Sequence, residues 1–203
     1  MAERIGLTMR TMSPADYVEP RDCLARDWGR FMAAALPGVA WLPIPNLGDE
    51  APAFAERWGL DGLLFTGGED PGTNPVRDRT EAALLAWAMA RPVGVFGVCR
   101  GLQVIQAWFG GPVDPCPGHA GTTHPVTVAG AIREVNSYHR IGVGAGRLAP
   151  PLRAFALSAD GWVEGLEHPG APLVAVQWHP ERLPAPDPMD VQLLMRVFAS
   201  KQE

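Results

Sequence analysis

Short apolar runs alternate with amphipathic segments from one end of the chain to the other. Most of these runs are apolar without alternation, and they cover residues 5–9, 39–44, 62–66, 93–98, 154–157 and 173–178. A strand covered by helices on both faces needs apolar side chains on both faces, so uniform runs of this length are typical of parallel sheets. The pattern therefore predicts an α/β fold with a mostly parallel central sheet and helices on both faces.

Between these runs, apolar residues recur with helical spacing. The segments with this spacing cover residues 20–35, 74–90, 100–109 and 188–200. One face of the first segment is predicted to be buried, and it carries Leu24, Trp28, Phe31 and Met32. Residues 110–127 are rich in Gly, Pro, Thr and His and show no periodicity. We expect an irregular loop there, near the functional edge of the sheet.

Composition and charge narrow the classes of function. A chain of 203 residues with 47% hydrophobic residues fits one domain over residues 1–203. The 17 basic and 22 acidic residues give a net charge of −5 without a basic cluster, so nucleic acid is not an expected partner. No apolar stretch has the length of a membrane span or signal peptide, which predicts a cytoplasmic protein without a membrane partner. Three cysteines, an odd number, favour free thiols.

Cys99 stands where an apolar run ends and a helical segment begins. Gly97 and Gly101 flank it in a Gly-x-Cys-x-Gly pattern, which is typical of a nucleophile on a tight strand-to-helix turn. The dipole of the following helix favours the thiolate, and the amide N–H of Arg100 can face a developing oxyanion. An arbitrary cysteine on a core strand is more often structural, but this context indicates a nucleophile.

A thiolate nucleophile needs a base and a group that orients the base. His179 and Glu181 follow the apolar run 173–178, and Pro180 fixes the backbone between them. The sequence therefore predicts a triad in which the carboxylate of Glu181 selects the tautomer of His179. Another apolar run ends in two glycines, and the amide of the second, Gly68, is a candidate second oxyanion donor.

With these motifs in this order, the chain resembles the class I glutamine amidotransferase superfamily. The resemblance implies a flavodoxin-like fold, hydrolysis of a γ-glutamyl amide through a γ-glutamyl thioester, and no metal or organic cofactor. It assigns Cys99 as the nucleophile, His179 as general base and then acid, and Glu181 as the orienting residue. The backbone amides of Gly68 and Arg100 would form the oxyanion hole.

The residues after the nucleophile resemble the γ-glutamyl hydrolase branch, the C26 peptidases, which includes γ-glutamyl-γ-aminobutyrate hydrolases. The likeness is supported by Arg77, Asp78, Arg79 and Glu81, and by residues 135–139, which are similar to an Asn-Ser-Phe-His segment of that branch. It implies that the small-molecule γ-glutamyl substrate is bound by Gly67, Gln103, Ser137, Tyr138 and His139.

A narrower likeness, to the γ-glutamyl-CDP-amidate hydrolases, rests on residues 21–29, residues 115–119 and the short length. It implies release of glutamate and cytidine diphosphoramidate for phosphoramidate modification of capsular polysaccharide. Such a leaving group requires basic side chains near the pocket, and the candidates are Arg21, Arg26, Arg100 and Arg140.

Several alternatives stay open. The motifs are also compatible with a γ-glutamyl-γ-aminobutyrate-type hydrolase, with a glutaminase subunit that depends on a synthase partner, and with a catalytically silent binding module. A homodimer is compatible with the sequence as well. Cys116, His119 and His124 look like part of a metal site. Three scattered ligands without a fourth favour a loop, however, so the sequence predicts no metal.

Overall fold

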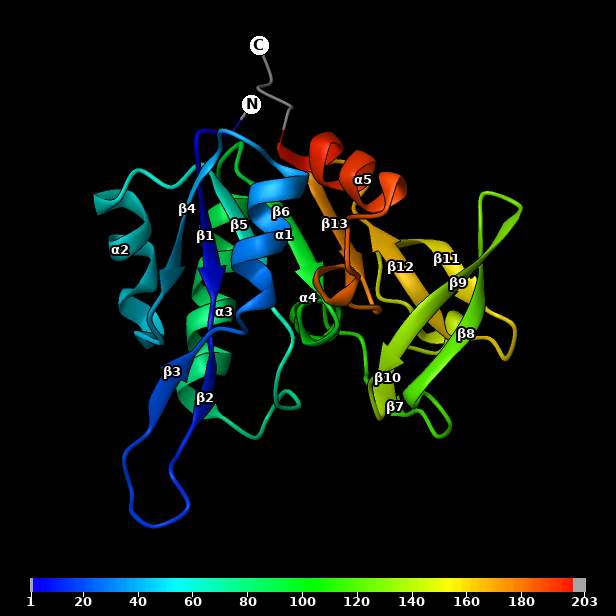
Figure 1. Cartoon of the computed structure of the whole chain (residues 1–203), viewed down its shortest axis with the longest axis horizontal. Helices are drawn as coiled ribbons and strands as arrows, with labels where there is room; N and C mark the ends of the chain where they lie inside the picture. Colours follow the sequence, from blue (N-terminus) through cyan, green and yellow to red (C-terminus); the bar gives the residue numbers. More distant parts are fainter. Residues whose placement is uncertain (1, 199–203) are drawn as a thin grey trace.

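The computed structural model describes residues 2–198, and a mixed sheet of nine strands runs through its centre (Figure 1). Neighbouring strands in one half are parallel: β1 (Arg4–Thr8), β4 (Ala40–Ile44), β5 (Gly62–Phe65), β6 (Gly94–Val98) and β13 (Leu173–Val176). The other half is antiparallel: β8 (Ala120–Val128), β9 (Ala131–Tyr138), β11 (Arg153–Ser158) and β12 (Val163–Glu167). The order across the sheet is β4, β1, β5, β6, β13, β12, β11, β8, β9.

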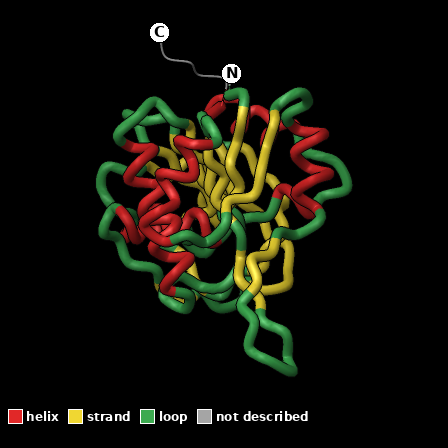
Figure 2. The backbone as a smooth tube through the Cα atoms, turned by 90° about the vertical axis from the view of Figure 1, so that its left-hand side faces the viewer, coloured by secondary structure: helices red, strands yellow, loops and turns green. Residues whose placement is uncertain are grey.

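Helices cover both faces of the sheet (Figure 2). Helices α2 (Ala51–Arg57), α3 (Pro75–Met89) and α4 (Arg100–Trp108) pack on one face, and α1 (Asp27–Ala35) and α5 (Pro188–Phe198) pack on the other. The shorter elements are β2 (Arg10–Met12), β3 (Arg21–Cys23), β7 (Asp114–Pro115), β10 (Ile141–Gly142) and the 3₁₀ turns η1 (Gly48–Glu50), η2 (Ala145–Arg147) and η3 (Pro180–Arg182). Within residues 2–198, no helix has the length and apolar content needed to cross a bilayer.

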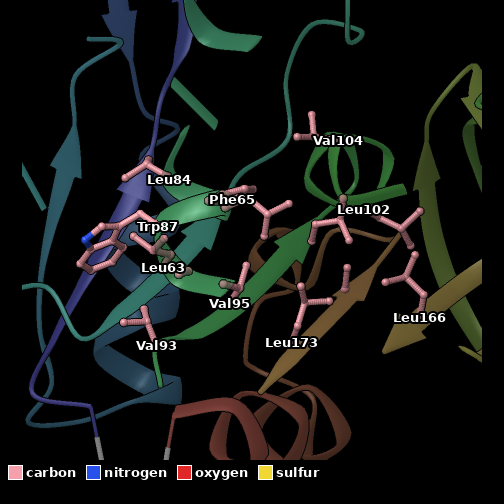
Figure 3. Packing of buried hydrophobic residues seen from close by; sticks show 14 of the residues in the cluster. Leu63, Phe65, Leu84, Trp87, Val93, Val95, Leu102, Val104, Leu166 and Leu173 are labelled. Atoms are coloured by element: carbon pink, nitrogen blue, oxygen red, sulfur yellow. The ribbon is translucent and has the colours of Figure 1, made fainter. Parts of the chain in front are cut away.

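The core lies in two clusters, one on each face of the parallel strands. Successive residues of a strand point to opposite faces, so Leu63 packs in one cluster and Leu64 in the other. Figure 3 shows the first cluster, which contains Phe65 and Val95 of the sheet and Leu84 of α3. This two-sided burial explains the uniformly apolar runs, and the predicted α/β class with helices on both faces is confirmed.

One predicted helix begins later in the structure than the sequence suggests. The first helix begins at Asp27 rather than at residue 20, because residues 21–23 form β3, which pairs with β2. The side chain of Asp22 accepts hydrogen bonds at 2.8 Å from the backbone N–H and at 2.6 Å from the amide group of Asn46. These tertiary contacts stabilise an extended segment despite its helical spacing. The helix predicted over residues 188–200 is present as α5 over Pro188–Phe198, and residues 199–200 lie outside the described residues.

The predicted loop at residues 110–127 is also wrong in part, because the long strand β8 begins at Ala120. Most side chains of β8 and β9 are exposed or half-buried. Their pairing is therefore driven mainly by backbone hydrogen bonds, and their sequences lack the apolar signal of the parallel strands. The sequence missed this antiparallel half except for β11.

Candidate active site

Cys99 occupies the turn between β6 and α4 in a backbone conformation that is rare for a residue with a side chain, with φ of 53°. Its backbone N–H donates to the carbonyl oxygen of Val176 at 2.8 Å, which fixes the turn against β13. A Cβ atom on Gly101 would lie 2.5 Å from the carbonyl oxygen of Phe65, and one on Gly97 would lie 2.9 Å from the Cβ of Ala175. Both flanking glycines are therefore required by close packing.

The pairing of β13 with β6 brings His179 to Cys99, since Val176 lies beside Val98 at the ends of the two strands. The Cys99 side chain and the imidazole lie together against Gly67, and the interaction with Cys99 is one of the causes that raise the pKa of His179. On the other side of the ring, Nδ1 lies 2.7 Å from Oε1 of Glu181, so the carboxylate accepts the Nδ1–H and leaves Nε2 for the sulfur. The three side chains are buried.

The environment of His179 favours its protonated form. Burial alone would lower the pKa of this imidazole, but the hydrogen bonds and charges of Cys99 and Glu181 raise it to about 9. His179 therefore holds a second proton at neutral pH. An imidazolium beside the sulfur stabilises a thiolate and can donate a proton to a leaving group.

Two residues outside the predicted triad hold its backbone in place. The side-chain amide of Asn136 accepts from the His179 N–H at 2.8 Å and donates to the His179 carbonyl oxygen at 2.9 Å. Arg30 of α1 donates to the carbonyl oxygen of Glu181 at 3.0 Å. Asn136 belongs to the 135–139 segment that the sequence singled out, whereas no sequence signal links Arg30 to a residue 151 positions away.

A buried ion network supports the glycine loop after β5. Arg77 donates to the carbonyl oxygens of Thr66 at 2.9 Å and Gly67 at 3.2 Å. Its Nε lies 3.0 Å from Glu81, which also pairs with Arg100 at 3.1 Å. The guanidinium of Arg100 thus points into the interior. Its backbone N–H belongs to the first residue of α4, where the helix provides no carbonyl acceptor, so this N–H is the group of Arg100 that can donate to an oxyanion.

The predicted substrate contacts fall into two groups. Gly67 lies against the triad, because a Cβ atom there would be 2.7 Å from Cε1 of His179 and 3.6 Å from the Cβ of Cys99. The ring of Tyr138 stands edge-on to His179, with centroids 5.6 Å apart. The polar atoms of the remaining three are engaged elsewhere: Gln103 donates to Ile141, Ser137 donates to His119, and His139 lies beside Ile141 and Glu164.

A pocket opens beside His179 and Gly68, and it is lined by two basic residues that no sequence signal indicated, Arg10 and Arg182. The same pocket is lined by Cys23, Leu24, Ala25 and Trp28, which belong to the 21–29 segment. Of the arginines expected there, Arg21 pairs instead with Glu19 at 2.8 Å and Arg100 is buried. The guanidinium of Arg182 lies 4.0 Å from the centre of the Tyr138 ring.

Another cluster within residues 2–198 has the residue types of a metal site, and it consists of His119, His124, His139 and Glu164. The sequence pattern pointed to His119 and His124 together with Cys116. The structure adds His139 and Glu164, which lie 20 and 45 positions after His119 in the sequence.

The family model for glutamine amidotransferase class-I matches residues 41–198. The chain belongs to the class I glutamine amidotransferase family. Members of this family are typically cysteine hydrolases. Within the family, a similar protein is the γ-glutamyl-CDP-amidate hydrolase of Campylobacter jejuni, which is 28% identical over 88% of this chain and 90% of that protein.

The chain also resembles larger proteins. The carbamoyl phosphate synthase small chain of Akkermansia muciniphila is 30% identical over 95% of this chain, which spans half the length of that protein. Among solved structures, a GMP synthase component from Thermoplasma acidophilum has the same fold, with a TM-score of 0.71 and 20% identity over 98% of this chain and 94% of that one.

The three cysteines of the chain should differ in reactivity. Burial and the charges of Glu164 and Asp160 raise the pKa of Cys116 to about 12. We expect iodoacetamide at neutral pH to label Cys99 first and to leave Cys116 unmodified, because alkylation needs the thiolate. Peptide mass spectrometry over time gives the rates, with the half-exposed Cys23 as reference. Labelling of Cys116 as fast as Cys99 would contradict this assignment.

Proposed function

We propose that this chain cleaves a γ-glutamyl amide through a γ-glutamyl thioester on Cys99, and that its substrate is γ-glutamyl-CDP-amidate. One observation carries the chemistry. A buried thiol on a strained turn at a helix N-terminus lies next to an imidazole whose Nδ1 faces a carboxylate at 2.7 Å. The proposed reaction releases glutamate and cytidine diphosphoramidate, the latter for phosphoramidate modification of polysaccharide, and it is expected in the cytoplasm.

In the first half of the proposed reaction, the Cys99 thiolate attacks the γ-carbonyl carbon of the substrate. The carbonyl oxygen becomes an oxyanion, which accepts hydrogen bonds from the backbone amides of Gly68 and Arg100. As the tetrahedral intermediate collapses, the carbon–nitrogen bond breaks and His179 gives its proton to the leaving nitrogen. The thioester and the free amidate are the products of this half.

In the second half, a water molecule replaces the leaving group beside His179. The now neutral imidazole takes a proton from the water as it attacks the thioester carbonyl. Breakage of the carbon–sulfur bond releases glutamate and restores the thiolate and the imidazolium. Throughout both halves Glu181 accepts the Nδ1–H, which keeps Nε2 directed at the reacting atoms.

The leaving group of the proposed substrate carries a diphosphate, and the pocket next to His179 offers charges of the right sign. Arg10 and Arg182 both line it. A guanidinium binds phosphate oxygens through paired N–H donors. This arrangement and the similarity to the C. jejuni enzyme over most of both chains support the nucleotide substrate over a γ-glutamyl-γ-aminobutyrate substrate, whose leaving group carries one carboxylate instead of a diphosphate.

A second candidate function is that of a glutaminase subunit that delivers ammonia to a synthase. The similarity to a carbamoyl phosphate synthase small chain over 95% of this chain favours it. The same triad would then act on glutamine itself, with a synthase as partner.

A panel of substrates separates these functions: glutamine, γ-glutamyl-γ-aminobutyrate, γ-glutamyl peptides and γ-glutamyl-CDP-amidate. We expect turnover of γ-glutamyl-CDP-amidate by the isolated chain with kcat/KM at least about 100-fold above that for glutamine, a difference typical of lost charge-assisted contacts. R10A and R182A should raise the KM for the nucleotide substrate but not for glutamine. The control is R153A, at an exposed position outside the pocket, which should leave both KM values unchanged. Preference for another γ-glutamyl amide would refute the substrate assignment. Lack of both turnover and acyl-enzyme would indicate a binding module.

A further inference from the structure

Four metal-ligating side chains meet at one end of the antiparallel half of the sheet. His119 immediately precedes β8 and His124 lies within it, His139 immediately follows β9, and Glu164 lies on β12. His119, His139 and Glu164 are buried, and His124 is mostly buried. Chain segments that are distant in sequence thus direct their polar atoms to one point in the interior.

The spacing of these atoms fits a metal ion better than hydrogen bonds. From Oε1 of Glu164, the nearest nitrogens of His119, His139 and His124 lie at 3.4, 3.4 and 3.6 Å. These distances exceed the roughly 2.7–3.2 Å of an N–H···O hydrogen bond. Ligands bound tetrahedrally to Zn²⁺ at about 2.0–2.1 Å are separated from one another by about 3.3–3.4 Å. All four ligand atoms lie within 4.8 Å of one another.

The carboxylate of Glu164 has no exposed surface, and neither of its oxygens has a hydrogen-bond partner among residues 2–198. Nε2 of His124 likewise lacks a partner among these described residues. A buried carboxylate without hydrogen bonds is strongly destabilising unless a positive charge compensates it. A cation at the centre of the cluster would satisfy both groups at once.

The outer nitrogens of two of the rings are already engaged. Nε2 of His119 lies 3.0 Å from Oδ2 of Asp160, and Nδ1 of His139 lies 3.0 Å from the carbonyl oxygen of Ile141. Both partners are acceptors, so each outer nitrogen carries the hydrogen and each inner nitrogen presents a lone pair. The two inner nitrogens face each other at 3.3 Å. Such outer partners are typical of metal-bound histidines, because they fix the ring orientation and the tautomer.

We propose that His119, His124, His139 and Glu164 bind one divalent transition-metal ion. Three imidazoles and a carboxylate fit Zn²⁺ best. With four ligands from the protein, the proposed site is closed and structural. It would fix the open end of the β8–β9 hairpin, where β8 begins and β9 ends, to β12. Since β9 also carries Asn136, which holds the backbone of His179, the ion would position the catalytic imidazole without touching substrate.

The test uses the full chain, freed of metal by dialysis against a chelator and then titrated with Zn²⁺. We expect about one Zn²⁺ per chain by elemental mass spectrometry and a rise in Tm of about 5 °C or more, because an ion that binds only the folded state stabilises it. Co²⁺ in its place should give the strong visible bands of a four-coordinate site. Each readout is independent of activity, and we expect the same results with C99A.

Two variants and a control locate the ion. H124A and E164Q should lose most of the bound metal and the Zn²⁺-dependent rise in Tm, whereas H168A, which changes a histidine outside the cluster, should retain both. If the wild-type chain binds no Zn²⁺ and shows the same Tm with and without it, the proposal is wrong. Equal binding by the variants would also overturn it, since the ion would then sit elsewhere. If a variant does not fold, the bound Zn²⁺ and the Tm of the wild-type chain, measured after removal of the ion and after its return, still test the proposal.

Discussion

C99A is expected to lower the hydrolysis of γ-glutamyl amides by about 10⁴-fold or more, because loss of a nucleophile removes the covalent route entirely. The fold should persist, since alanine is smaller than cysteine and has the same single Cβ atom, so the backbone at φ of 53° is no more strained than in the parent chain. Steady-state turnover and mass spectrometry of the acyl-enzyme measure the effect, and thermal unfolding checks the fold. The thioester mass should be absent from the variant.

The matched control for this experiment is C116A, which removes a buried thiol from a position outside the triad. It should retain turnover and acyl-enzyme formation. If C99A turned over substrate at the rate of the parent chain, Cys99 could not be the nucleophile, and the function proposed for the chain would fall with it.

H179A should lose nearly as much activity as C99A, and the double variant should lose no more than the worse single one. The reason is that the thiolate and the imidazole act in the same step, so their losses do not multiply. Multiplicative losses would show that the two residues act in separate steps. H168A is again the control.

The pH dependence of the parent chain gives a second readout of His179. The pKa of this imidazole is raised to about 9, so its proton is present at neutral pH and is lost as the pH rises through about 9. Turnover should fall over that range because no acid remains for the leaving nitrogen. The stabilising effect of the raised pKa follows the same direction: it is complete below the ordinary pKa of about 6.5 and disappears above about 9. A plateau of activity through pH 10 would contradict the assigned acid.

The sequence predicts the parallel half of the fold well and the antiparallel half poorly, and the difference has a physical cause. Strands such as β5 and β6 are buried on both faces, which leaves continuous apolar runs. Strands β8 and β9 carry mostly exposed side chains, so their sequences resemble loops. Strand β3 is held by Asp22 and Asn46, a contact between residues 24 positions apart that no local pattern records.

At the site, the sequence located Cys99, His179 and Glu181, and their catalytic roles remain predictions for the variants to test. These residues follow the ends of apolar strands, so the local sequence pattern is enough to place them at the carboxyl edge of the sheet. Arg30, which supports the triad, was beyond its reach, because it acts through the backbone carbonyl of Glu181, 151 positions along the chain. Arg77 was singled out as part of a motif, but its hydrogen bonds to the backbone carbonyls of the glycine loop were not predicted. Glu164 was missed for a similar reason, since its three neighbours come from other strands.

The orientation of Arg100 shows that the side chain after the nucleophile has a structural role and does not bind the leaving group. Its guanidinium is enclosed between Asp78 at 2.6 Å and Glu81 at 3.1 Å, so it cannot touch a substrate. Glu81 also pairs with Arg77 at 3.0 Å, so replacing Arg100 alone would leave this buried carboxylate with one of its two ion-pair partners and Asp78 without the contact at 2.6 Å. The side chain of Arg100 therefore contributes to the internal ion network rather than to substrate binding. An arginine after the nucleophile thus reports how the glycine loop is supported from the interior, and by itself it says nothing about which leaving group the pocket accepts.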